Sequence, residues 1–125
     1  MTIIEAITKS EASRPGLASD ADKIRWLSAL DGRIKCEVIG VREGSEWASG
    51  FVGYDEGDDV ATDLLVPPPY DELYLRYLEA QIDYETGEIA RYNNAAAAFS
   101  AAYDAFLAYY HRTHAPLARA KLRYF

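Results

Sequence analysis

Two groups of side chains in this sequence could in principle bind a metal ion, a histidine pair and a cluster of four aspartates. His111 and His114 are separated by three residues, which would place both on one face of a helix. No acid or cysteine accompanies them locally, so we interpret them as surface residues near the negative end of a helix. The other four are Asp55, Asp58, Asp59 and Asp63. They lack the alternate spacing and the final glutamate of a calcium-binding loop, so we predict a solvated acidic loop and no bound metal.

No spacing in the chain is typical of catalysis. Neither a Walker-type loop nor the Gly-x-Gly-x-x-Gly or Gly-x-Ser-x-Gly pattern occurs. Glu79 and Asp83 are i, i+4 neighbours, and we expect them to form a solvated stripe with Arg76 on one helix. The only cysteine, Cys36, lies opposite the predicted apolar arc of its helix and has no histidine nearby in sequence to activate it. We therefore expect a protein that is not an enzyme and needs no cofactor, with a carboxylate-dependent metal enzyme using Asp55 to Asp63 as the rival hypothesis.

Length and charge limit the function further. The 125 residues and 14.0 kDa suffice for one domain, residues 1–125, but not for two. The net charge of −7 excludes nucleic-acid binding through a broad basic face. A single cysteine cannot form an intrachain disulfide, and no segment is typical of a signal peptide or a transmembrane helix. We expect a soluble protein made in a reducing compartment, with no membrane partner.

The C-terminal segment has the opposite charge. Residues 112–125 contain four basic and no acidic side chains, together with large apolar ones. Apolar side chains have little use in a segment meant only for water, so we interpret this segment as a docking tail, with a frayed terminus as the alternative. The residues that we expect to dock are Arg119, Lys121, Leu122, Arg123, Tyr124 and Phe125.

Periodicity predicts a mainly α protein, a small helical bundle. A short helix should end at Arg14-Pro15-Gly16, and a second, starting at a capping box at Ser19, should cover about 20–39. Its apolar arc comprises Ile24, Leu27, Leu30, Ile34, Val38 and Val41. For residues 40–66, which are rich in glycine and acidic side chains, we predict a short β-hairpin or extended loop. Helices over about 69–85 and 88–111, separated by Thr86-Gly87, predict a helical hairpin over about 69–111, followed by an extended C-terminal tail.

The last predicted helix has two unusual faces. One should be the core stripe, Ile89, Tyr92, Ala96, Phe99, Tyr103, Phe106, Leu107 and Tyr110. The other consists mainly of alanine, and Asp104 is the only charged residue between Asn94 and His111. Alanine tolerates exposure, but a helix with so little charge is more often buried on both sides. We therefore predict that another copy of the chain packs there, through Ala97, Ala98, Ala101, Ala105 and Tyr109.

Five segments together resemble a known family. They are Asp22 to Ile34, Leu64 to Tyr74, Ala80 to Tyr84, Arg91 to Asn94 and Tyr110 to His114. In this order they resemble the head-to-tail connectors, or adaptors, of the neck of long-tailed bacteriophages and prophages. The resemblance spans about residues 22–114.

The resemblance implies a non-catalytic subunit of the virion neck, made in the bacterial host cytoplasm. Such subunits form a ring, usually of twelve copies, that joins the portal protein to the stopper or tail-completion protein and keeps the DNA channel continuous. The basic tail would dock on the portal. Passing DNA would not be bound sequence-specifically, and an acidic loop facing the channel or the next neck ring would suit this role. The loop residues are Asp55, Glu56, Asp58 and Asp59.

Another function class stays open. An acidic helical domain of this size also suits a small regulator, such as an antitoxin-like protein, that binds a basic partner through its acidic face. Such a protein would be a dimer and absent from virus particles. The composition of purified particles distinguishes the two hypotheses.

Overall fold

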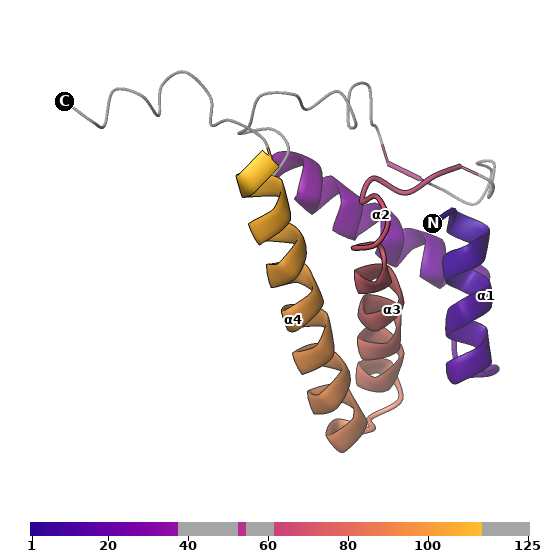
Figure 1. The fold of residues 1–125 in the computed structure, drawn as a ribbon. Helices are drawn as coiled ribbons and strands as arrows, with labels where there is room; N and C mark the ends of the chain where they lie inside the picture. Colours follow the sequence, from indigo (N-terminus) through magenta and orange to yellow (C-terminus); the bar gives the residue numbers. More distant parts are fainter. Residues whose placement is uncertain (38–52, 55–61, 114–125) are drawn as a thin grey trace.

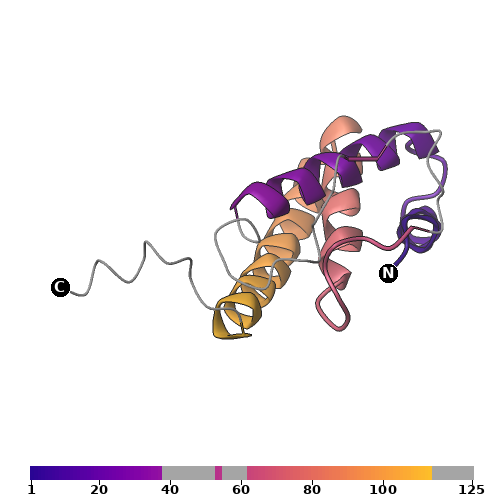
Figure 2. The same ribbon diagram turned by 90° about the horizontal axis from the view of Figure 1, so that it is seen from above.

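The computed structural model describes residues 1–37, 53–54 and 62–113, and these form a bundle of four helices (Figure 1). The helices are α1, Ile3–Ser13, α2, Asp20–Glu37, α3, Glu72–Glu85, and α4, Ile89–Thr113. The third helix lies between α1 and α4, and α2 crosses over it (Figures 1 and 2). The prediction of a mainly helical bundle is confirmed.

Helix α1 begins at a capping box. The Thr2 hydroxyl accepts a hydrogen bond from the Glu5 amide at 3.2 Å, and the Glu5 carboxylate accepts one from the Thr2 amide at 3.4 Å. Ile3, Ala6 and Ile7 are buried at helical spacing. The helix ends where the Arg14 amide donates to the Ser10 carbonyl at 2.8 Å, ahead of Pro15. The prediction that it ends at Arg14-Pro15-Gly16 is correct.

Helix α2 follows the predicted pattern. The Ser19 hydroxyl accepts a hydrogen bond from the Asp22 amide at 3.1 Å, as expected of an N-cap. The predicted apolar residues within the described part of the helix are all buried, namely Ile24, Leu27, Leu30 and Ile34. Lys23 is also fully buried, and its ammonium lies 3.0 Å from the Glu11 carboxylate on α1. This ion pair joins the first two helices. Val38 and Val41 lie outside the described residues.

Helix α3 starts three residues later than predicted. Residues 67–71 form turns, and the Tyr70 amide donates to the Pro67 carbonyl at 3.1 Å. The Leu73 amide likewise donates to the Tyr70 carbonyl at 3.4 Å, so turns in which an amide bonds three residues back continue up to the start of the helix. Asp71 occupies the N-cap position, but its carboxylate binds the Met1 ammonium at 3.0 Å and caps no helix amide.

Helices α3 and α4 form the predicted hairpin. Gly87 makes the turn with a positive φ of 75°, a backbone conformation that glycine adopts without a steric penalty. On α4, Tyr103, Phe106 and Tyr110 are buried against the core, as predicted. Ile89, predicted to belong to the same stripe, is instead 72% exposed, because it lies in the turn of α4 nearest the hairpin tip, where α3 has already ended. The helix continues to Thr113, two residues beyond the predicted end, where an extended tail was expected to begin at 112.

The described residues between α2 and α3 form no strand. Asp63 makes a single antiparallel bridge with Thr2 at the start of α1, and the Leu64 amide donates to the Met1 carbonyl at 3.0 Å. Residues 62–64 therefore pair with the N-terminus. Most of the segment predicted as a hairpin or loop, residues 40–52 and 55–61, lies outside the described residues.

The core lies around α3, which packs against all three other helices. Leu73, Leu78 and Ile82 on this helix are each buried. Because the central helix is covered on several sides, α4 remains at the edge of the bundle with one face open (Figure 1).

Candidate functional site

The open face of α4 is the alanine face, defined by Ala97, Ala98, Ala101, Ala105 and Ala108. All are exposed except Ala98, which is half-buried. Two further alanines turn inward, since Ala95 is buried and Ala102 packs against the core. The predicted interface alanines thus lie on one accessible surface of the described fold. Small side chains there allow another helix backbone to approach closely.

Tyr109, the fifth predicted interface residue, is held from within the chain. Its ring stacks on the ring of Tyr70, with centroids 4.6 Å apart and planes 25° apart. The residue is half-buried, so part of its side chain remains accessible beside the alanine face. Stacked tyrosines lose little further entropy on binding, which suits a contact surface.

Aromatic contacts fix the position of α4 relative to α2 and α3. The Tyr77 and Phe99 rings lie 5.2 Å apart, and the Arg33 guanidinium on α2 lies 5.3 Å from the centroid of the Tyr103 ring. A cation over an aromatic face is stabilising because the ring carries a negative quadrupole face. The alanine face therefore belongs to a helix that is anchored along its inner side.

Beside the alanine face lies an open groove of about 320 Å³, the arginine groove. It is lined by Arg14, Arg76, Glu79, Arg91, Asn94, Ala95 and Ala98. Ala98 belongs to both surfaces, so the groove adjoins the alanine face directly. Three guanidinium groups and one carboxylate belong to its lining, in a chain that is acidic as a whole.

Two of these arginines pair with acids that we predicted to be solvated. Arg14 binds the fully buried Asp83 through two hydrogen bonds, from Nε to Oδ1 at 2.8 Å and from the terminal Nη2 to Oδ2 at 3.0 Å. Arg76 donates to Glu79 at 3.0 Å, and Glu79 is only 7% exposed. The predicted solvated stripe is wrong, because α1 packs against α3 and Arg14, the residue that follows α1, binds Asp83. Hydrogen bonding to Asp83 raises the pKa of Arg14, and hydrogen bonding to Glu79 raises that of Arg76.

A buried carboxylate that the sequence analysis missed joins α2 to the loop and to α3. Asp31 accepts hydrogen bonds from the Tyr54 hydroxyl at 2.6 Å, the Tyr74 hydroxyl at 2.5 Å and the Leu65 amide at 3.1 Å. The Tyr74 hydroxyl in turn accepts from the Val66 amide at 2.8 Å. The sequence did contain a signal for this cluster, because Asp31 lies on the apolar arc of α2 among Leu27, Leu30 and Ile34.

Burial dominates the titration of this cluster. Desolvation raises the pKa of Asp31, although its three hydrogen bonds act in the opposite direction. Burial also raises the pKa values of Tyr54 and Tyr74, and the nearby Asp31 charge adds to both shifts. Both phenols therefore stay protonated donors, and we interpret the cluster as structural.

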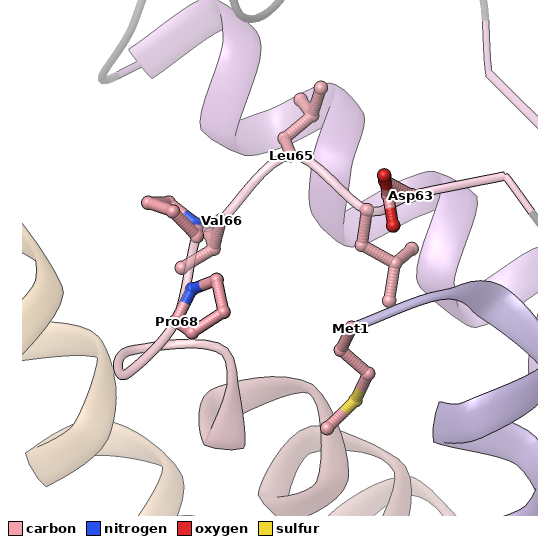
Figure 3. A pocket seen from close by; sticks show the side chains of 7 residues that line it. Met1, Asp63, Leu65, Val66 and Pro68 are labelled. Atoms are coloured by element: carbon pink, nitrogen blue, oxygen red, sulfur yellow. The ribbon is translucent and has the colours of Figure 1, made fainter.

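A second hollow lies where the N-terminus meets residues 63–68 (Figure 3). Its volume is about 310 Å³, and its lining is Met1, Asp63, Leu64, Leu65, Val66, Pro67 and Pro68. Asp63 is the only charged side chain in that lining, and the close-up shows no group of convergent polar side chains (Figure 3). Its composition favours no particular chemistry.

Several predicted site residues lie outside the described ranges. They are Asp55, Glu56, Asp58 and Asp59 of the acidic loop, Arg119, Lys121, Leu122, Arg123, Tyr124 and Phe125 of the tail, and His114. Within residues 1–37, 53–54 and 62–113, no three side chains of the metal-binding types come together. Over the same ranges, no helix combines the length and apolar character needed to cross a bilayer.

Comparison with protein-family models, with curated proteins and with solved structures gives no match to this chain. The function is therefore inferred from the residues themselves and from the resemblance of the five segments to head-to-tail connectors.

Proposed function

We propose that this protein is a structural subunit of the neck of a long-tailed bacteriophage. Copies of it, twelve in the usual arrangement, form a ring that joins the portal to the stopper or tail and keeps the DNA channel continuous. The observation that carries the proposal is the alanine face of α4, which is exposed and carries no charged side chain. The five segments that resemble head-to-tail connectors support it.

The alanine face is better suited to protein contact than to water. A surface helix normally presents charged side chains to solvent, whereas Asp104 is the only charge on α4 between Asn94 and His111. Packing a neighbouring copy against this face would bury small apolar side chains at little cost in side-chain entropy. We therefore assign Ala97, Ala98, Ala101, Ala105 and Tyr109 to the contact between subunits.

The charge distribution suits a passage for DNA. A ring of subunits with net charge −7 would repel the phosphate backbone, so DNA could slide through without adhering. Asp55, Glu56, Asp58 and Asp59 are the densest run of acids, and we propose that they face the channel or the next neck ring. The basic tail, including Arg119 and Phe125, would dock on the portal.

Replacing Ala101 by tryptophan should prevent ring assembly without unfolding the monomer. Ala101 is exposed, so the larger side chain meets no described core residue but blocks the approach of a second helix. We expect at least about tenfold less of the variant in particles, measured by quantitative peptide mass spectrometry. The matched control is Ala29→Trp at an exposed alanine of α2, which should assemble normally. Loss of the helical circular-dichroism signal in Ala101→Trp would instead place Ala101 in the core.

Reversing the charge of the acidic loop should impair DNA exit. Lysine at Asp55, Glu56, Asp58 and Asp59 would replace repulsion of the phosphate backbone by attraction. We expect slower DNA release from particles or failed assembly, and a milder defect when the same four residues become the neutral Asn or Gln. Release kinetics of packaged DNA provide the measurement. Unchanged infectivity of the lysine variant would mean that the loop only faces solvent.

A further inference from the structure

The two edges of the alanine face carry opposite charges. Arg91 and Asp104 are 13 residues apart on α4, which places them about 140° apart around the helix at 100° per residue. Both are exposed, and neither forms an ion pair with any residue that the structure describes. Arg91 borders the arginine groove on one side of the face, and Asp104 lies toward the other side.

The arginine groove has unused capacity to bind a carboxylate. Arg14 and Arg76 already bind Asp83 and Glu79, so their charges are largely compensated. The Arg91 guanidinium makes no such pair with the residues that the structure describes, so its donors are available to a carboxylate from outside them. The Asn94 side chain adds an amide to the same lining, and Ala95 and Ala98 form an apolar wall. Carboxylates bind such guanidinium groups through charge-assisted hydrogen bonds.

Asp104 is the acid beside the alanine face that a neighbouring copy would cover. A neighbour seated on the alanine face would remove water from Asp104, and a buried charge without a partner is strongly destabilising. Contact with a cation of the neighbour would compensate for that loss. On the neighbouring copy, the arginine groove lies next to the alanine face, because Ala98 belongs to both.

We infer that Asp104 of one copy binds in the arginine groove, at Arg91, of the next copy. This inference rests on the proposed ring. Because the two partners are different patches on opposite edges of the alanine face, the contact is heterologous, and each copy uses its groove toward one neighbour and its Asp104 toward the other. Contacts of that kind can continue around a closed ring, unlike an isologous two-fold pair. The 13-residue separation corresponds to a stagger of about 20 Å between neighbouring α4 helices.

A charge swap tests the contact in particles. The variants are Arg91→Asp, Asp104→Arg and the double variant, each scored by the ratio of this chain to the portal in purified particles. Each single reversal should lower the ratio at least about tenfold, because it opposes like charges in the contact. The double variant should return to within about twofold of the wild type, since the pair is restored with its polarity exchanged.

Controls separate this contact from general effects of charge. Arg25→Asp reverses an exposed arginine on α2 that pairs with Asp22 within its own helix, and it should not change the ratio. Circular dichroism establishes that each variant is folded, and the neutral Arg91→Gln and Asp104→Asn variants replace any that is not. Single reversals without effect, or a double variant that stays defective, would overturn the Asp104–Arg91 contact alone. Absence of the wild-type chain from particles would overturn the proposed function and this inference with it.

Discussion

Replacing Arg14 by methionine should lower the free energy of unfolding by about 3 to 5 kcal/mol, one of the two largest stability losses that we expect from one substitution. Arg14 is the partner of Asp83, which is fully buried and joined to it by two hydrogen bonds. Methionine fills a similar volume but leaves the Asp83 carboxylate without a counter-ion. Glu79, 3.9 Å from Arg14, would lose part of its compensation as well.

Urea unfolding followed by circular dichroism measures this loss. Arg25→Met is the matched control, since Arg25 forms an exposed pair with Asp22, and such pairs contribute at most about 1 kcal/mol. The double variant Arg14→Met with Asp83→Leu should recover most of the stability, because a buried ion pair can be replaced by apolar residues of similar volume. A loss below about 1 kcal/mol for Arg14→Met would contradict the role given to this pair.

Replacing Asp31 by alanine should cost about 3 kcal/mol or more. The Tyr54 and Tyr74 hydroxyls and the Leu65 amide would each lose an acceptor, and a buried donor without a partner costs about 1 to 3 kcal/mol. Asp31→Asn retains an acceptor oxygen and should cost less. Tyr54→Phe, which removes one of the three donors, should cost about 1 kcal/mol. Equal stability of the alanine variant and the wild type would mean that this cluster does not hold the loop to the helices.

The cost of Asp31→Asn should also depend on pH. Burial raises the pKa of Asp31 above its ordinary value of 3.8, so the folded protein holds this proton more tightly than the unfolded chain. The contribution of Asp31 to stability is then fully present below pH 3.8 and is lost as the pH rises through the folded-state pKa. The difference in unfolding free energy between wild type and Asp31→Asn should therefore fall from acidic toward neutral pH. Urea unfolding over this range measures it, and a difference that grows with pH would show that the hydrogen bonds outweigh desolvation.

Local periodicity predicted most of the helical architecture. Ile24, Leu27, Leu30 and Ile34 share one face at helical spacing, and the structure buries all four. The break predicted at Thr86-Gly87 is also present, because Gly87 adopts the positive φ that the turn between α3 and α4 requires. The start of α3 was predicted too early because a proline suits the first turn of a helix in isolation, whereas here residues 68–71 form turns and the Asp71 carboxylate binds the Met1 ammonium.

Contacts between residues far apart in sequence could not be read from these patterns. Asp83 lies four residues after Glu79, as on a solvated polar helix face, and only the fold brings Arg14, 69 residues away, against it. Asp31 was visible as an acid within an apolar arc, but its partner Tyr74 is 43 residues away. The alanine face was visible in the sequence because it depends on one helix, and its partner remains a proposal because another copy of the chain must supply it.

The composition of purified virus particles tests the central claim most directly. Quantitative peptide mass spectrometry would give the ratio of this chain to the portal protein in tailed particles of the phage that encodes it. A neck ring predicts that the chain is present at close to one copy per portal subunit. Absence of the chain from intact tailed particles would contradict the structural role and favour an acidic helical regulator.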